Sequence, residues 1–133
     1  MKITKKIFSE ISAGELLDKI SILEIKKNKI KDKKKNKNVR NELSSLLLTA
    51  KDNNLFKRKN ISKAYKNLKK INEKLWKIED EIRDCERNKN FNDKFIFLAR
   101  SVYINNDLRA KIKNSINTSA DSNIKEVKSY KKY

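Results

Sequence analysis

The chain has 133 residues and a formal net charge of +18, and it contains one glycine, no proline and no histidine. This length is typical of one domain with a modest hydrophobic core. Tight hairpins and βα turns depend on glycine and proline, so their near absence predicts an all-helical protein. The lack of histidine excludes histidine general bases and the usual zinc-ligand sets.

We expect neither a membrane span nor a secretory signal. No apolar run approaches the roughly twenty residues that cross a bilayer. The N-terminus is basic but lacks the apolar stretch of a signal peptide. The single cysteine, Cys85, cannot form an internal disulfide, which fits a reducing compartment. These features predict a cytoplasmic protein.

The positive charge has two competing explanations. Lysine and arginine neutralise phosphates and release counterions, which favours a nucleic-acid partner. However, 29 of the 35 cationic residues are lysine, and the chain also has 17 Asn and 16 Ile. All three residue types have codons that can be built from A and U alone, so an AT-biased genome would raise their number. We favour this compositional bias and keep a basic adaptor for nucleic acid or an acidic protein as the alternative. The cations that would serve the adaptor are Lys57, Arg58, Lys59, Lys63, Lys66 and Lys70.

The N-terminal half predicts two helices of unequal length. Ser12 and Glu15 have the spacing of a capping box, so the first helix is expected over about 13–34. The lysine-rich segment near 31–38 is expected to be a solvated loop. A short helix follows over about 39–50, where apolar residues again recur at helical spacing.

The C-terminal half predicts a long antiparallel helix pair. Over about 61–88, apolar residues recur at intervals of three and four, the pattern of a helix-packing seam. After a short polar turn, a second long helix is expected over about 92–117, and such helices pack antiparallel. We predict one helical-bundle domain over 1–133 with a C-terminal tail over 118–133. An exposed edge of the seam would permit a homodimer.

The last predicted helix carries polar residues where its apolar stripe should continue. Val102 is followed at helical spacing by Asn106, Arg109 and Lys113, which therefore share its inward face. Polar strips also border the apolar stripes of the helices at 13–34 and 61–88, and packing would bring the three strips together. The residues of this predicted interhelical site are Glu15, Lys19, Lys26, Trp76, Glu79, Arg83, Tyr103, Asn106, Arg109 and Lys113.

The buried cations of this predicted site require carboxylates as partners. An unpaired buried ion costs on the order of several kcal/mol, so Arg83 and Arg109 require carboxylates, which we expect from Glu15, Glu79 and Glu86. Four of the six arginines lie between 83 and 109, although lysine is the usual cation of this chain. A guanidinium binds carboxylate or phosphate in a bidentate manner that an ammonium cannot reproduce.

Two hypotheses follow for the polar strips. One is an ion-pair network that fixes the register of the helices. The other is a pocket for a small anionic ligand carrying phosphate or carboxylate, in which cations contact the anion and carboxylates orient them or act as acid and base. Asn106 and Tyr103 would add directional hydrogen bonds. Carboxylates three or four residues apart could instead hold Mg²⁺, although the neighbouring cations would compete with it. The candidates are Glu15 with Asp18 and, less well spaced, Glu79 with Asp80 and Glu86.

Four segments together resemble a family of small bacterial proteins known only as a domain of unknown function. They are GELLDKISILEIK at 14–26, LWKIEDEIRDCE at 75–86, LARSVYINNDLRAKIKNSIN at 98–117 and EVKSY at 126–130. The resemblance spans nearly the whole chain in order and implies an all-helical fold without assigning an activity. It also implies recurrent polar positions, which match Glu15, Asp18, Lys19, Glu24, Lys26, Trp76, Glu79, Asp80, Arg83, Glu86, Arg100, Tyr103, Asn106, Asp107, Arg109, Lys111 and Asn117.

Overall fold

The structure, a computed structural model, describes residues 4–133 and is all-helical over that range, as the sequence predicts. It contains four α-helices and one short 3₁₀ helix, and no strand occurs among the described residues. The helices in chain order are α1 (Ala13–Lys29), α2 (Lys33–Asp52), η1 (Leu55–Lys57), α3 (Lys59–Arg87) and α4 (Asp93–Ser119).

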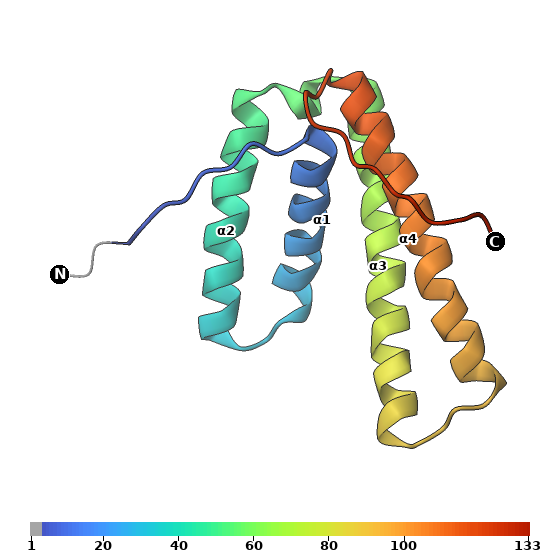
Figure 1. The fold of residues 1–133 in the computed structure, drawn as a ribbon. Coiled ribbons are helices and arrows are strands. Elements are labelled where there is room, and N and C mark those ends of the chain that lie inside the picture. Colours follow the sequence, from blue (N-terminus) through green and yellow to red (C-terminus); the bar gives the residue numbers. More distant parts are fainter. Residues whose placement is uncertain (1–3) are drawn as a thin grey trace.

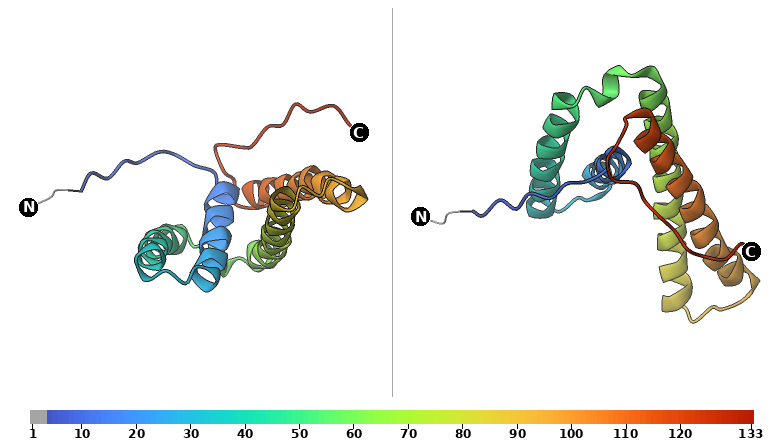
Figure 2. Two further views of the ribbon diagram at one scale, coloured as in Figure 1. Left: turned by 90° about the horizontal axis from the view of Figure 1, so that it is seen from below. Right: turned by 45° about the horizontal axis from the view of Figure 1, so that its top comes forward.

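The helices form two antiparallel hairpins, α1–α2 and α3–α4, joined through η1 (Figure 1). The long pair predicted from the seam is therefore confirmed as α3 and α4. Helix α1 is the middle element, since it packs against α2 on one side and against both α3 and α4 on the other (Figure 2). The α3–α4 hairpin extends well past the end of α1, so its far end lacks a third helix beside it (Figure 1).

The hydrophobic core has two unequal parts. The larger part lies where α1 meets its neighbours and includes the fully buried Leu17, Ile20, Ile61, Leu68 and Ile116. The smaller part lies near the free end of the α3–α4 hairpin and is built on Ile78, Cys85 and Leu98. Removal of one such side chain from water contributes about 1.5–3 kcal/mol, so the free end is the less stabilised half.

The lysine-rich segment near 31–38 is helical from Lys33 onward, so the loop predicted there is wrong. Asp32 occupies the N-cap position of α2, and its carboxylate accepts a hydrogen bond from the Lys35 backbone N–H at 2.9 Å. Aspartate is a strong N-cap and lysine a good helix former, so α2 begins within the lysine run. The first helix consequently ends at Lys29, about five residues earlier than predicted.

Helices α1 and α4 approach each other closely at the single glycine. The Gly14 backbone N–H donates to Asn117 Oδ1 at 2.6 Å, and a Cβ atom on Gly14 would lie only 2.3 Å from the Lys113 carbonyl oxygen. No other residue type fits this crossing without displacing backbone. Ser12 caps the same end of α1, where its Oγ accepts from the Glu15 N–H at 3.1 Å as predicted. This contact places the first turns of α1 directly against α4.

Candidate functional site

Three helices converge on one buried carboxylate, that of Asp18 in α1. Its side chain is 1% exposed. Arg109 of α4 donates two hydrogen bonds to it, from Nε to Oδ1 at 2.9 Å and from Nη2 to Oδ2. Asn72 of α3 donates from Nδ2 to Oδ1 at 2.8 Å and to Ser21 Oγ at 2.7 Å. The carboxylate is thus paired and hydrogen-bonded on both oxygens, which a buried ion requires.

Lys113 of α4 is the second buried cation of this network. Its side chain is 8% exposed, and its Nζ lies 2.8 Å from Glu15 Oε2 and 3.1 Å from Glu126 Oε2 in the C-terminal tail. Burial disfavours the charged ammonium, but the hydrogen bond to Glu15, the ion pair with Glu126 and the nearby charge of Asp18 outweigh burial and raise the pKa of Lys113. Lys113 is therefore a charged, structurally held ammonium.

Arg109 remains charged for a similar reason. Its hydrogen bond to Asp18 raises the pKa of the guanidinium, and this effect exceeds the opposing effect of burial. Two cations, Arg109 and Lys113, thus face three carboxylates, Asp18, Glu15 and Glu126. The network is electrically balanced to within one charge.

An open cleft of about 520 Å³ lies immediately beside Arg109, between α3, α4 and the end of α1. We call it the interhelical cleft. Ile22, Ile25 and Leu75 form its apolar wall. Its polar lining consists of Asn72, Trp76, Glu79, Asp80, Arg83, Asn106 and Arg109.

The two arginines of the cleft differ in how firmly they are held. Arg109 is 27% exposed, and its Nη1 makes only a long contact of 3.4 Å to Asn106 Oδ1. Arg83 is 64% exposed and pairs along its own helix with Glu79, at 2.5 Å from Nη1 to Oε2. Arg109 is therefore a firmly held group of the inner wall, and Arg83 is an exposed cation at the rim.

The structure divides the ten predicted site residues into three groups. The cleft brings together Trp76, Glu79, Arg83, Asn106 and Arg109. The ion-pair network behind the cleft contains Glu15 and Lys113. The remaining three, Lys19, Lys26 and Tyr103, do not line the cleft.

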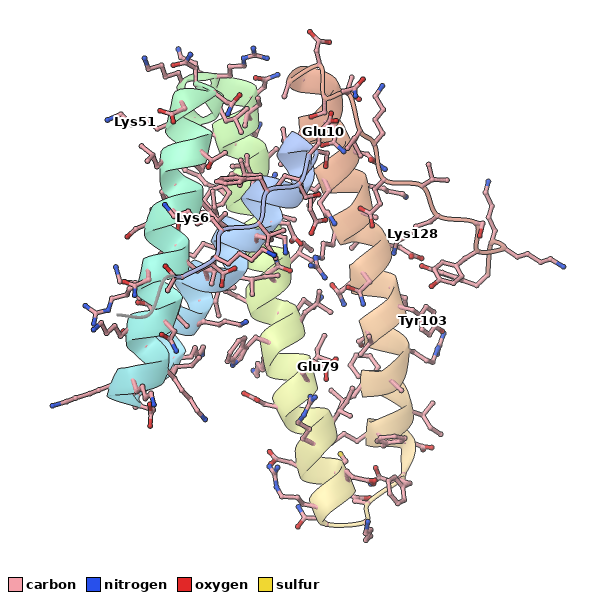
Figure 3. The ribbon with its side chains drawn as sticks, turned by 60° about the vertical axis from the view of Figure 1, so that its left-hand side comes forward. Lys6, Glu10, Lys51, Glu79, Tyr103 and Lys128 are labelled. Carbon is pink, nitrogen blue, oxygen red and sulfur yellow. The ribbon has the colours of Figure 1, made fainter. Side chains whose placement is uncertain are left out.

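Tyr103 belongs to another face of α4, the face followed by the C-terminal tail. Its ring packs edge-on against Tyr133 with 5.2 Å between ring centroids, and Lys128 of the tail lies 3.7 Å from Asp107 of α4. Figure 3 places Tyr103 and Lys128 together beside α4, apart from Glu79 on α3. The sequence analysis predicted a directional hydrogen bond from Tyr103 to a ligand in the cleft. The position of Tyr103 outside the cleft lining is inconsistent with that prediction.

The predicted site residues omit several buried polar residues, among them Asp18, Asn72 and Asn105, and they omit Glu126, which pairs with Lys113. Asp18 could have been found, because it lies among the apolar residues of α1 and therefore points inward. Asn72 could have been found in the same way from the seam of α3. Glu126 lies in a tail without helical periodicity, so no pattern indicated its contact with Lys113.

A second polar cluster joins α1 to α3 on the other side of the seam. Glu24 accepts a hydrogen bond from the Tyr65 hydroxyl at 2.6 Å and from Lys69 Nζ at 3.0 Å. Burial and the hydrogen bond to Glu24 raise the pKa of Tyr65 far above its ordinary value. This cluster ties α1 to α3 without contributing to the interhelical cleft.

Comparison with known protein families identifies the family to which this chain belongs. The model of a family of unknown function, DUF6165, matches residues 7–133, nearly the entire chain. The chain belongs to this family. No curated protein and no solved structure matches it. The resemblance seen in the sequence is thus confirmed at the level of the family.

Two features do not occur in the described part of this DUF6165 chain. Among residues 4–133, no group of three or more Cys, Asp or Glu side chains is arranged to hold a metal ion. Glu15 and Asp18, which the sequence offered as possible Mg²⁺ ligands, are instead occupied by Lys113 and Arg109. Within the same residues, no helix has the length and apolarity needed to cross a bilayer.

Proposed function

We propose that the interhelical cleft binds a small anionic molecule that carries a phosphate or carboxylate group. The observation that carries this proposal is the orientation of Arg109, whose guanidinium is held by Asp18 along one edge and borders the cleft with the other.

The donor inventory of Arg109 supports the proposal. A guanidinium has five N–H donors, and Asp18 takes one from Nε and one from Nη2. The two hydrogens of Nη1 make no contact shorter than 3.4 Å, the distance to Asn106. Ion pairing with Asp18 therefore fixes the guanidinium in place without consuming all of its donors. Such preorganisation reduces the entropy lost when a ligand binds.

The rest of the cleft limits the class of ligand. Its charged lining consists of two cations, Arg83 and Arg109, and two anions, Glu79 and Asp80, so its formal charge is zero. A ligand that carries only negative charges therefore gains little binding free energy from the charges of the cleft lining. A ligand fits better if its anionic group meets the arginines while hydroxyl or amino groups donate to Glu79 and Asp80. Trp76 and Leu75 offer an apolar surface to the ligand's carbon skeleton.

A thermal-shift screen of phosphorylated and carboxylated metabolites tests the proposal, with and without Mg²⁺. A ligand present at 100 times its dissociation constant stabilises the folded chain by about 2.7 kcal/mol, which raises Tm by several degrees. Arg83→Ala changes the rim of the cleft, and Asn106→Ala removes only the 3.4 Å contact to Arg109 Nη1 and leaves the two hydrogen bonds between Arg109 and Asp18, so both should weaken the shift. Arg87→Ala is the matched control, because Arg87 also forms an exposed ion pair along α3 but does not line the cleft.

Two outcomes would contradict the proposal. In one, no compound of the panel raises Tm. In the other, the shift is the same in Asn106→Ala, Arg83→Ala and Arg87→Ala. Either result would favour the competing hypothesis, in which the polar strips act only to fix the register of α1, α3 and α4.

A further inference from the structure

A straight row of lysines runs along an exposed side of α3. Its members follow one another at intervals of four, three, four, four and three residues, so they fall within an arc of about 80° on the helix. All are exposed, and among residues 4–133 none of them forms an ion pair. The row consists of Lys59, Lys63, Lys66, Lys70, Lys74 and Lys77.

The surroundings of the row are mixed. Asn60 and Asn67 lie beside it on α3, and both are exposed. Lys66 and Lys70 also line a groove with Leu47 of α2 and Phe56 of η1, and Glu24 and Glu73 contribute two acids to the same groove. On α4, the exposed residues Leu108, Lys111 and Ser115 share one face of the helix by their spacing.

The lysine row lowers the stability of α3. Like charges at i,i+4 destabilise a helix by about 0.2–0.5 kcal/mol a pair, and the row contains several such pairs. Residues 59–77 of α3 contain seven lysines and one acidic residue, Glu73, whereas residues 78–87 contain five acidic residues and two arginines. A bias toward lysine codons raises the number of lysines, but it does not remove acids from one half of a helix.

We propose that this lysine row binds the sugar–phosphate backbone of a nucleic acid. Successive lysines rise by about one helical turn, 5.4 Å, and the row extends about 27 Å. Such a regular, straight array of positive charges fits a polymer with evenly repeated phosphates better than a compact acidic protein. A bilayer surface would also need several large apolar side chains exposed along the row, whereas Leu47 and Phe56 adjoin only Lys66 and Lys70. Lysine contacts position the backbone without reading bases, so binding is expected to be independent of sequence.

Fluorescence anisotropy with a labelled 20-base-pair DNA duplex and a labelled 20-nucleotide RNA tests the proposal across a range of salt concentrations. Six phosphate contacts predict that log K falls against log salt with a slope of about −5 for the duplex and about −4 for the single strand. The comparison of the two probes shows which form of the backbone is preferred. Vesicles containing phosphatidylserine serve as the third arm.

The decisive comparison uses two variants of equal net charge. In the row variant, Lys63, Lys66, Lys70 and Lys74 are all changed to Gln, and we expect at least a tenfold loss of affinity and a slope reduced by about four. In the control variant, four exposed lysines at the start of α2 and just before it are changed to Gln, and affinity should be nearly retained. The control positions are Lys31, Lys33, Lys34 and Lys37. Circular dichroism and Tm of both variants verify that the fold is kept.

Three results would overturn the inference. Equal weakening in both variants would mean that overall charge, not the row, attracts the nucleic acid. Binding to vesicles without binding to either oligonucleotide would assign the row to a membrane surface. Unchanged affinity in the row variant would remove the row from the interface. None of these results bears on ligand binding in the interhelical cleft, because the substituted lysines lie outside it.

Discussion

Asp18 and Arg109 lie 91 residues apart in the chain, yet Arg109 holds both carboxylate oxygens of Asp18 through Nε and Nη2. The two partners differ in exposure, since Asp18 is 1% exposed and Arg109 is 27% exposed. The pair joins α1 to α4 at the inner wall of the interhelical cleft. Substitution of Asp18 and substitution of Arg109 should therefore change the free energy of unfolding by different amounts.

Arg109→Met should destabilise the chain by about 3 kcal/mol, because it leaves the buried carboxylate of Asp18 without its main partner. Asp18→Asn should cost less, since the guanidinium left behind borders an open cleft and can be solvated. The double variant Asp18→Asn/Arg109→Met should be more stable than Arg109→Met alone, because it no longer contains an unpaired buried carboxylate. Urea unfolding at pH 7 measures all three, and a larger loss in Asp18→Asn than in Arg109→Met would contradict this account.

Gly14→Ala should destabilise the chain by about 1–3 kcal/mol, although alanine is the better helix former. The added Cβ would lie 2.3 Å from the Lys113 carbonyl oxygen, and backbone cannot yield as a flexible side chain does. Thermal unfolding measures the effect. Asn41→Ala, at an exposed position of α2, is the control for helix propensity and should be neutral or slightly stabilising.

The chain should lose stability as the pH rises above about 10. Burial and the hydrogen bond to Glu24 raise the pKa of Tyr65 in the folded state, and the pKa of Lys113 is raised as well. A group whose folded pKa is raised gives its full stabilisation below its unfolded pKa and loses it as the pH rises toward the folded value. The free energy of unfolding from urea titrations at pH 8–11 should therefore decline across this window.

Tyr65→Phe identifies the source of that decline. It removes the hydroxyl that donates to Glu24, so it should cost about 1 kcal/mol at pH 7 and make the decline above pH 10 shallower. Tyr130→Phe is the control, because the Tyr130 ring is 83% exposed, and it should behave as the parent chain does. Equal slopes in the parent and Tyr65→Phe would show that other groups cause the alkaline loss.

The free end of the α3–α4 hairpin should exchange its amide hydrogens faster than the part beside α1. Its core is built on Ile78, Cys85 and Leu98, and α1 does not reach it (Figure 1). Local opening is easiest where few apolar contacts must be broken. Hydrogen exchange followed by mass spectrometry should show lower protection over 80–100 than over 110–117.

Leu98→Ala should widen this difference at a cost of about 2–3 kcal/mol, since Leu98 is buried in the smaller core. Ile96→Ala, two residues earlier and 53% exposed, is the matched control and should leave the exchange pattern nearly unchanged. Uniform protection along α3 and α4 in the parent chain would contradict the division of the core into two parts.

The features that the sequence predicted well are local. The spacing of Ile61, Leu68 and Leu75 identified the seam of α3, and Ser12 identified the start of α1. Each depends on residues within one or two turns, where helical periodicity and capping chemistry act directly. The start of α2 was missed for a local reason too, because the lysine run obscured the capping role of Asp32.

The choice of partners across helices could not be predicted from periodicity. Glu15, Glu79 and Glu86 were expected to neutralise the two arginines, but Arg109 pairs with Asp18 and Glu15 pairs with Lys113. Arg83 alone found an expected partner, Glu79, which lies one turn away on the same helix. Which carboxylate meets which cation depends on the depth and angle of the α1–α4 crossing, and the close approach at Gly14 sets both.

The order in which the chain is made gives this crossing a consequence for biosynthesis. Glu15 and Asp18 leave the ribosome early, but Lys113 and Arg109 follow them by 98 and 91 residues. Until α4 emerges, these acids have no counter-charge and must stay in water, so the first hairpin cannot dock in its final position. A nascent chain halted anywhere before the fourth helix would therefore remain open and accessible to proteases and chaperones.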